Sequence, residues 1–301
     1  MADLKGQCPF RSKPLHLVKL SFRISIDAFR GFLADDGWAI ASHIALSTLM
    51  ALFPFLIVVT ALAGFFFGSK QLADEAAKLL LEAWPQQVAG PIATDVTRVL
   101  TGARGDVLTF GVLFAVYFAS SGVESLRVGL NRAYTAPERR SWWLLRLESI
   151  FYVLVGAAAI LAFAFLVVLE PLIWQNLVRF VPALTPFAGI VTLARYGIAA
   201  SVLVIALYIL HLWLPAGRRS LVQITPGIVV TLLLWLVSGA AFGRYLASYA
   251  FAYVSMYAGL ASAMIALVFL YVCASIFIYG GELNACIAQR REQGREKRNA
   301  R

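Results

Sequence analysis

The sequence predicts an all-α, polytopic membrane protein, and three observations carry that prediction. Hydrophobic residues make up 60% of the 301-residue chain, against roughly 45–50% in soluble domains. Charged residues make up only 14%, and the mean hydropathy is +0.78. Six apolar runs are close to or above about 20 residues, the length that an α-helix needs to cross a bilayer. Because lipid cannot satisfy free backbone groups, each run is expected to be a helix.

The six expected spans divide the chain into three parts. Residues 1–37 form a basic amphipathic segment expected on the cytoplasmic side, 38–281 a six-helix transmembrane domain, and 282–301 a basic cytoplasmic tail. Within this tail, QRREQGREKRNAR (289–301) is expected to be disordered. The expected spans are about 38–67, 107–126, 143–169, 187–214, 222–246 and 255–281. The first span is long, so we expect it to be tilted, kinked at Pro54, or partly outside the bilayer.

The longest connection, residues 68–106, is expected to form an amphipathic helical hairpin on the outer mouth of the bundle. Apolar residues recur at helical spacing on both sides of Pro85. They are Leu72, Ala76, Leu79, Leu80 and Ala83 before it, and Ile92, Val96 and Val99 after it. The alternative is a plain spacer without a helical face.

The basic balance of the chain indicates its orientation. The formal net charge is +10, and the isoelectric point is about 9.8. In a soluble protein this would favour a nucleic-acid partner, but Lys and Arg also accumulate in cytoplasmic loops of membrane proteins. With the N-terminus inside, nineteen Lys and Arg residues fall in inner segments and six in outer ones. We therefore expect both termini inside and no specific nucleic-acid partner.

Cysteine and histidine give no sign of a metal or cofactor site. Cys8, Cys273 and Cys286 are far apart and form no CxxC pair. The three histidines, at 16, 43 and 211, show no metal-ligand spacing. The sequence thus predicts no cofactor, no metal site and no catalytic residue.

Polar side chains inside the first span are candidates for a transport pathway, because burying them in lipid is costly. His43 and Ser47 lie one helical turn apart, close to the face that carries Pro54. Pro54 also leaves a carbonyl without its helical donor one turn earlier. The alternative is that His43 and Ser47 are hydrogen-bonded packing contacts between helices.

The segment SSGVESLRVGLNRAY (120–134) places a polar stripe at the end of the second span. Glu124, Arg127 and Asn131 share one helical face, and Glu124 can pair with Arg127 at i, i+3. We expect Asn131 to meet the GGELN segment of the sixth span. A polar clasp that closes the inner end of the bundle is one interpretation, and a gate or substrate contact is the other.

Two further places complete the candidate polar residues. Arg195 lies inside the fourth span, where it snorkels outward, pairs with an acid such as Glu170, or holds an anionic substrate. Glu282 and Asn284 lie at the inner end of the sixth span, beside Gly280 and Gly281, which allow close helix approach. A cation from the end of the second span is the expected partner of Glu282.

Three segments together resemble the YihY/BrkB family of bacterial inner-membrane proteins. They are ASHIALSTLMALFPFLIVV, SSGVESLRVGLNRAY and YGGELNA, in the order of the family, and the likeness covers roughly residues 25–290. The resemblance implies a six-helix, multi-pass protein of the cell inner membrane. It carries over Pro54 from the first segment, Glu124 and Asn131 from the second, and Glu282 and Asn284 from the third. Family labels include a virulence factor and a tRNA-processing ribonuclease, ribonuclease BN.

Three functions follow as hypotheses. The first is a transporter that moves or handles a lipid-like or anionic amphipathic substrate of the envelope. The second is a non-transporting scaffold that binds envelope proteins or further copies of itself, with membrane lipids around it. The ribonuclease reading is the weakest, because metal-dependent hydrolysis needs clustered ligands in water. We therefore expect no enzymatic activity.

Overall fold

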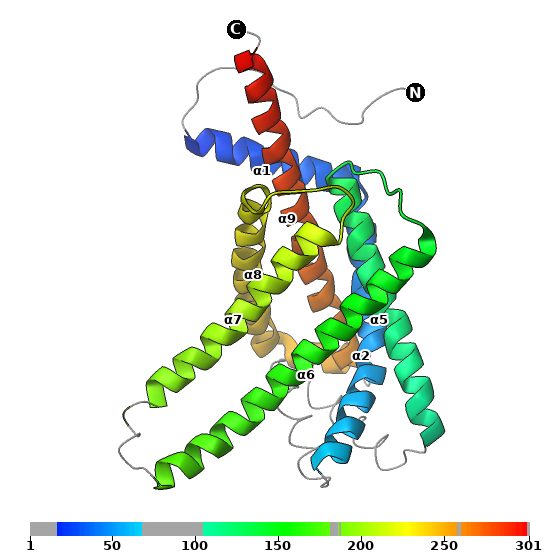
Figure 1. Ribbon diagram of the computed structural model, residues 1–301, viewed down its shortest axis with the longest axis vertical. Helices are drawn as coiled ribbons and strands as arrows, with labels where there is room; N and C mark the ends of the chain where they lie inside the picture. Colours follow the sequence, from blue (N-terminus) through cyan, green and yellow to red (C-terminus); the bar gives the residue numbers. More distant parts are fainter. Residues whose placement is uncertain (1–16, 68–104, 181–185, 187, 258–259, 300–301) are drawn as a thin grey trace.

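The computed structural model describes residues 17–67, 105–180, 186, 188–257 and 260–299 (Figure 1). Within these ranges the side chains of some residues, Arg195 among them, lie outside the description. The described residues form helices and no strand, which confirms the all-α prediction. The helices are α1 (Leu17–Ala34), α2 (Gly37–Phe67), α5 (Gly105–Ala133), α6 (Trp142–Phe180), α7 (Ala188–Trp213), α8 (Leu221–Tyr257) and α9 (Ala261–Asn299). The predicted hairpin at 68–106 lies outside the described residues, except for the first two residues of α5.

Four helices contain stretches that are long and apolar enough to cross a membrane. They are Thr109–Ala133 in α5, Trp142–Ala159 in α6, Leu221–Ser248 in α8 and Ala261–Gly294 in α9. Shorter apolar stretches of the described residues are Gly37–Leu52 in α2 and Ala200–Trp213 in α7. Four of the six expected spans are supported in this way, and the other two stay predictions.

One end of the bundle gathers the segments that were expected to be cytoplasmic. α1, the loop between α5 and α6, the loop between α7 and α8, and the end of α9 all lie there (Figure 1). We call this the loop end. Which side of the membrane it faces stays a prediction.

Helix α9 lies at the centre of the packed part of the bundle and contacts α1, α2, α5 and α8. The largest cluster of buried apolar residues is built around it, near the loop end. Its larger members are Phe32, Ile40, Ile44, Leu130, Leu207, Leu214, Ile224, Ile228, Phe277 and Ile278. Burial of apolar area contributes about 25 cal/mol per Å² only where it displaces water. Where the helices are surrounded by lipid, their association is stabilised by close packing instead.

Glycines allow α8 and α9 to pack closely. A side-chain carbon added at Gly227 would overlap the Gly280 carbonyl, and one added at Gly280 would overlap Thr231. The Gly227 N–H donates to Asn284 Oδ1 over 2.6 Å. The predicted close approach at Gly280 is therefore present, and its partner is α8.

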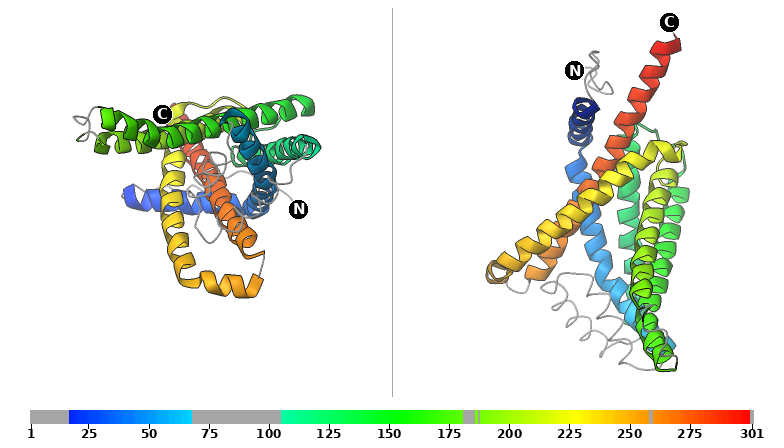
Figure 2. Two further views of the ribbon diagram at one scale, coloured as in Figure 1. Left: turned by 90° about the horizontal axis from the view of Figure 1, so that it is seen from below. Right: turned by 90° about the vertical axis from the view of Figure 1, so that its left-hand side faces the viewer.

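Helix α1 is amphipathic and lies across the loop end (Figure 2). Ala28 and Phe32 are buried, whereas Phe22 is 66% exposed and Phe29 is 45% exposed. The chain leaves α1 through Asp36, which has a positive φ of 56°, a region that Asp tolerates better than most residues. An exposed apolar face next to the bundle fits a helix that lies along a membrane surface.

The expectation of a disordered tail is wrong for residues 289–299. Helix α9 continues to Asn299 and projects beyond the rest of the bundle (Figure 2). Arg, Gln, Glu and Lys, which dominate this stretch, have high helix propensity and can extend a helix that is already nucleated. Arg290 Nη2 also donates to Asp27 Oδ2 of α1 over 2.5 Å, which ties the extension to the bundle.

Candidate functional site

A polar groove lies between α2 and α5. It has a volume of about 470 Å³ and runs from the loop end along the two helices. Its polar lining residues are Asp36, His43, Ser121, Glu124, Ser125 and Arg132. Asp36 lies in the turn before α2, and the other side chains lie on α2 and α5, two apolar helices that pack against each other, so the groove is set into the side of the bundle. We call it the α2–α5 groove.

His43 is the polar centre of the α2–α5 groove. Its Nδ1 atom lies 2.5 Å from Ser125 Oγ of α5 and 3.5 Å from Ser47 Oγ of α2. The imidazole is exposed, whereas Ser47 is buried and faces Gly122 of α5. The predicted His43–Ser47 pair is thus present, but the stronger contact of His43 crosses to the other helix.

Two ion pairs neutralise the charges along the α2–α5 groove. Asp36 Oδ2 pairs with Arg132 Nη1 over 3.2 Å at the loop end. Farther from the loop end, Glu124 Oε2 pairs with Arg146 Nη1 of α6 over 2.9 Å. The Arg146 guanidinium also stacks on the Tyr117 ring. The predicted Glu124–Arg127 pair is wrong, because each residue has its own partner on α6: Arg146 for Glu124 and Glu148 for Arg127.

Arg127 is only 2% exposed and is held by α6. Its Nη2 atom donates to the Leu145 carbonyl over 3.1 Å and to Ser149 Oγ over 2.9 Å, and it lies 3.5 Å from Glu148. The Nε and Nη1 atoms of Arg127 are buried without a partner among the described residues. A cation buried this deeply fixes the rotation of α5 against α6.

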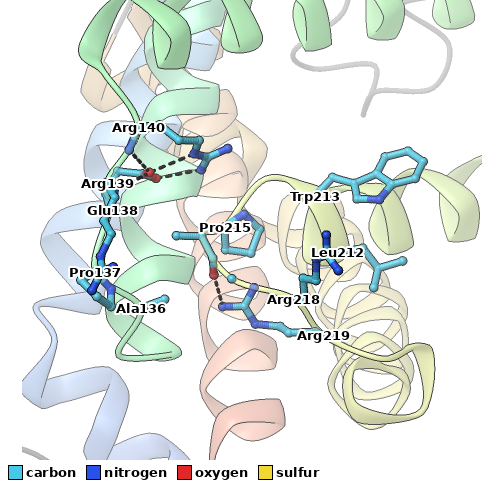
Figure 3. A pocket seen from close by; sticks show the side chains of 12 residues that line it. Ala136, Pro137, Glu138, Arg139, Arg140, Leu212, Trp213, Pro215, Arg218 and Arg219 are labelled. Atoms are coloured by element: carbon cyan, nitrogen blue, oxygen red, sulfur yellow. Dashed lines mark hydrogen bonds and ion pairs between the residues drawn. The ribbon is translucent and has the colours of Figure 1, made fainter.

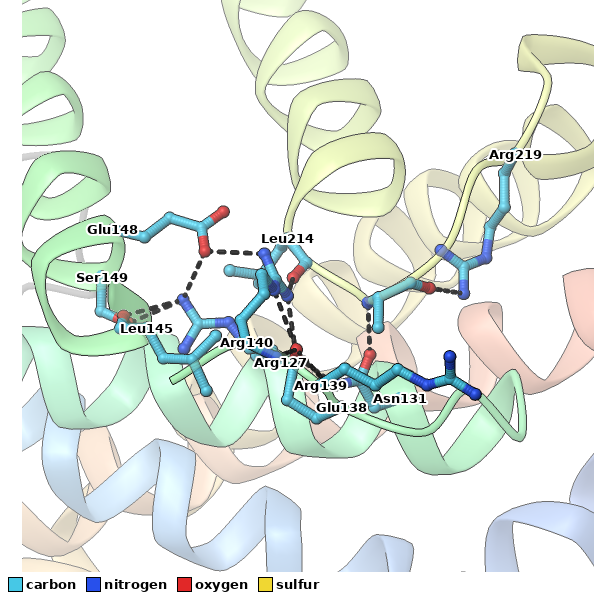
Figure 4. Close-up of polar contacts among 11 residues, drawn as sticks. Arg127, Asn131, Glu138, Arg139, Arg140, Leu145, Glu148, Ser149, Leu214 and Arg219 are labelled. Carbon is cyan, nitrogen blue, oxygen red and sulfur yellow. Dashed lines mark hydrogen bonds and ion pairs between the residues drawn. The ribbon is translucent and has the colours of Figure 1, made fainter. Parts of the chain in front are cut away.

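Asn131 joins the two loops at the loop end. Its Oδ1 accepts from the Ala216 backbone N–H over 2.6 Å, and its Nδ2 donates to Glu138 Oε2 over 3.1 Å (Figure 4). Arg140 holds both oxygens of Glu138, at 2.9 Å and 2.8 Å, and donates to the Leu214 carbonyl and to Glu148. We call Asn131, Glu138 and Arg140 the loop clasp.

The hydrogen bonds of the loop clasp shift the pKa values of Glu138 and Arg140. Hydrogen bonds to Glu138, first of all from the Arg140 guanidinium, lower the pKa of this carboxyl to about 2. The same carboxylate raises the pKa of Arg140 above its ordinary value. Both groups are therefore charged at neutral pH and hold the loop after α5 in one conformation.

Asn284 and Glu282 of α9 lie away from the α2–α5 groove. Asn284 bonds the Gly227 N–H of α8 and donates from Nδ2 to the Tyr134 hydroxyl over 3.4 Å. Tyr134, not Asn131 as expected, is thus the residue at the end of α5 that meets the GGELN segment. Glu282 is 4% exposed, lies against Gly31 of α1, and makes no ion pair within the described residues, so its expected cationic partner is not there.

Two predicted residues, Pro54 and Arg195, are not among the lining residues of the α2–α5 groove. Pro54 lies within α2, which continues through it to Phe67. Arg195 belongs to α7, and its side chain is outside the described residues. The sequence reasoning missed Ser125, which lines the α2–α5 groove, and Arg146, which pairs with Glu124 of that groove. It also missed Glu138 and Arg140, which complete the loop clasp. The available signal for Arg146 is its charge at the start of an apolar helix, but charge in such a position indicates the orientation of the helix and not the partner of the residue.

Within the described residues, no group of three or more His, Cys, Asp or Glu side chains has a metal-binding arrangement. The functional candidates that the polar contacts define are the α2–α5 groove and the loop clasp.

Comparison with known proteins places the chain in a family. Over 266 residues it is 26% identical to the ribonuclease-like protein YfkH of Bacillus subtilis (strain 168), covering 88% of this chain and 95% of that protein. Over 258 residues it is 25% identical to the UPF0761 membrane protein RC1_0578 of Rhodospirillum centenum (strain ATCC 51521 / SW), covering 86% of this chain and 56% of that protein. No solved structure matches. The family described as Virulence factor BrkB matches residues 28–301, and with four apolar helices of membrane-spanning length the chain is a multi-pass membrane protein that belongs to this BrkB family.

Proposed function

We propose that this protein binds an amphipathic, lipid-like substrate of the cell envelope and moves its headgroup along the α2–α5 groove. The observation that carries the proposal is a polar groove of about 470 Å³ on the side of two apolar helices. A lipid headgroup needs such a polar path, whereas its acyl chains can stay in the bilayer. The setting proposed for this activity is the bacterial inner membrane.

The exposed side chain of His43 is one reason to expect that a ligand binds in the α2–α5 groove. Ser125 occupies the Nδ1 atom of this imidazole, but the ring is exposed in an apolar stretch of α2, Gly37–Leu52, where a polar atom that faces hydrocarbon is costly. Ser121 and Ser125 place further hydroxyl groups on the same surface. A headgroup that both donates and accepts hydrogen bonds could add contacts to these groups beyond the Ser125–His43 bond that they already make.

The charges of the α2–α5 groove narrow the class of substrate. Asp36 and Glu124 are each paired with an arginine, so no strong uncompensated charge faces the groove. Paired charges favour a hydroxyl-rich or zwitterionic headgroup over a small bare anion. Of the two substrate classes that the sequence left open, the lipid-like one fits this groove better.

A lipid-scrambling assay tests the proposal. Protein in phosphatidylcholine vesicles that carry a fluorescent phospholipid is expected to expose inner-leaflet label to an external quencher faster than protein-free vesicles. Ser125→Ala and His43→Ala should slow this rate at least about tenfold, which corresponds to about 1.4 kcal/mol. Ser201→Ala is the matched control, because Ser201 is an exposed serine of α7 bonded only to its own helix, at Gly197. Equal rates in all variants, or no acceleration by the unaltered protein, would refute the proposal.

A scaffold without transport is the second candidate function, and the projecting end of α9 favours it. Helix α9 projects beyond the packed bundle (Figure 2), and its last residues include Arg291, Arg295, Lys297 and Arg298. It could hold envelope proteins or a second copy of the chain. Crosslinking from residue 295 in intact membranes would detect such a partner, and stable partners together with no scrambling would favour the scaffold.

We propose no enzymatic activity. One relative has a ribonuclease-like name, and that name is the reason for a direct assay. Purified protein incubated with tRNA is expected to leave it intact. Cleavage that Glu124→Gln or Glu282→Gln abolished would overturn this expectation.

A further inference from the structure

A second cavity lies at the loop end, between the α5–α6 loop and the α7–α8 loop. Its volume is about 730 Å³, and four arginines and one carboxylate line it (Figure 3). The arginines are Arg139, Arg140, Arg218 and Arg219, and the carboxylate is Glu138. The lining therefore has a formal charge of +3. We call this cavity the loop pocket. It shares no lining residue with the α2–α5 groove.

Most of this positive charge is not balanced by protein groups. Glu138 is taken up by Arg140, which Glu148 also contacts. In the part of the chain that the structure describes, the side chains of Arg139 and Arg218 make no ion pair, and both residues are exposed. The loop pocket thus presents cations that a soluble anion can reach.

Arg219 adds a buried donor to the loop pocket. Its Nη2 atom donates to the Ala216 carbonyl over 2.8 Å, and its guanidinium lies 3.9 Å from the centre of the Tyr134 ring. Its Nη1 atom is buried and has no acceptor among the described residues. Burial lowers the pKa of Arg219 from its ordinary value, because the charged form loses hydration and no carboxylate compensates it. A bound anion would supply the missing acceptor.

The surroundings of the loop pocket place it at headgroup level. Trp213 lines it and is 63% exposed. Trp142 and Trp143, which begin α6, are also exposed. Tryptophan concentrates at membrane–water interfaces. Further along α6, away from the loop end, the exposed apolar side chains of Leu144, Leu147 and Phe151 could lie along acyl chains.

We propose that the loop pocket binds a phosphoryl group, supplied by an anionic lipid headgroup or by free phosphate. Guanidinium groups bind phosphate oxygens in a bidentate geometry, and basic pockets between transmembrane helices suit anionic headgroups. The carboxylate of the pocket does not repel the ligand strongly, because Arg140 neutralises it. This site is independent of the proposed transport function, since it uses other residues.

Calorimetric titration of the purified full-length protein in a neutral maltoside detergent tests the site. The three probes are dihexanoyl phosphatidylglycerol, dihexanoyl phosphatidylcholine and inorganic phosphate. Phosphatidylglycerol is expected to bind at least about tenfold more tightly than phosphatidylcholine. Displacement of phosphatidylglycerol by inorganic phosphate would support recognition of the phosphoryl group alone. Binding of the lipid without such displacement would support the lipid headgroup as the source.

Variants locate the binding and provide the control. Arg139→Gln combined with Arg218→Gln should weaken phosphatidylglycerol binding at least about tenfold, and folding should survive because both arginines are exposed and unpaired in the described structure. Arg23→Gln combined with Arg291→Gln removes the same charge from exposed positions on α1 and α9, and should leave the affinity unchanged. Equal binding of the two lipids, an unchanged affinity in the pocket variant, or equal losses in both double variants would overturn the proposal.

Discussion

Replacing Asn131 by aspartate tests the loop clasp with almost no change in shape. The introduced carboxylate would keep an oxygen for the Ala216 N–H, but the Nδ2 donor to Glu138 would be lost. A hydrogen bond to a charged group contributes about 1.5–3 kcal/mol. Two carboxylates at the present Nδ2–Oε2 distance of 3.1 Å would in addition repel each other by about 5 kcal/mol at an effective dielectric constant of 20.

Nearby groups reduce that repulsion. Arg140 lies within 2.9 Å of both oxygens of Glu138 and would also attract the introduced carboxylate, and the Glu138 side chain is 23% exposed. We therefore expect Asn131→Asp to lower the free energy of unfolding by about 3 kcal/mol in total. Denaturation with sodium dodecyl sulfate in mixed micelles, followed by tryptophan fluorescence at pH 8, measures this change.

Controls separate the lost hydrogen bond from the repulsion. Asn131→Ala removes the bond without adding charge and should cost less than Asn131→Asp at pH 8. The difference should shrink toward pH 5, because the introduced carboxyl group can donate to Glu138 once it is protonated. Adding Glu138→Gln to Asn131→Asp should recover part of the loss, since a glutamine amide can donate to the introduced carboxylate. The reasoning is refuted if Asn131→Asp is as stable as the unaltered protein, or no less stable than Asn131→Ala.

Three further predictions concern other parts of the bundle. Gly227→Ala should cost more than about 2 kcal/mol, because the added methyl group overlaps α9 and displaces Asn284; thermal unfolding measures it, and an unchanged midpoint would show that the helices can separate freely. The effects of Glu124→Gln and Arg146→Gln on the free energy of unfolding should be non-additive, with a coupling of about 1–3 kcal/mol in a double-mutant cycle. Simple additivity would mean that the 2.9 Å ion pair is absent in the membrane. The carboxyl of Glu138, with its pKa lowered to about 2, should contribute its full stabilisation above about pH 5 and lose it between about pH 4.5 and 2; unfolding midpoints of the unaltered protein and Glu138→Gln should converge over this range, and a constant gap would contradict the assignment.

The sequence by itself predicts much of the architecture of this protein. Apolar runs of about 20 residues have one stable form in lipid, which is the helix, so helix type and most helix starts follow from local composition. The ends of α5, α6, α8 and α9 do not, because these helices continue past their apolar runs. The segment 120–134 also reveals its own polar stripe, since residues three and four apart share a helical face. The basic tail was misjudged, because charge suggested disorder while helix propensity and the contact with Asp27 favour continuation of α9.

The partners of the polar residues were decided only by the tertiary structure. Glu124 pairs with Arg146 instead of Arg127, and Asn131 bonds Ala216 and Glu138 instead of α9. Helical periodicity relates residues within one helix, but it does not determine how far a helix is rotated against its neighbours. Close packing at Gly227 and the buried Arg127 set that rotation, and they bring together loops that lie about eighty residues apart in the chain. The α2–α5 groove and the loop pocket exist because of that rotation, so neither could be read from one helix at a time.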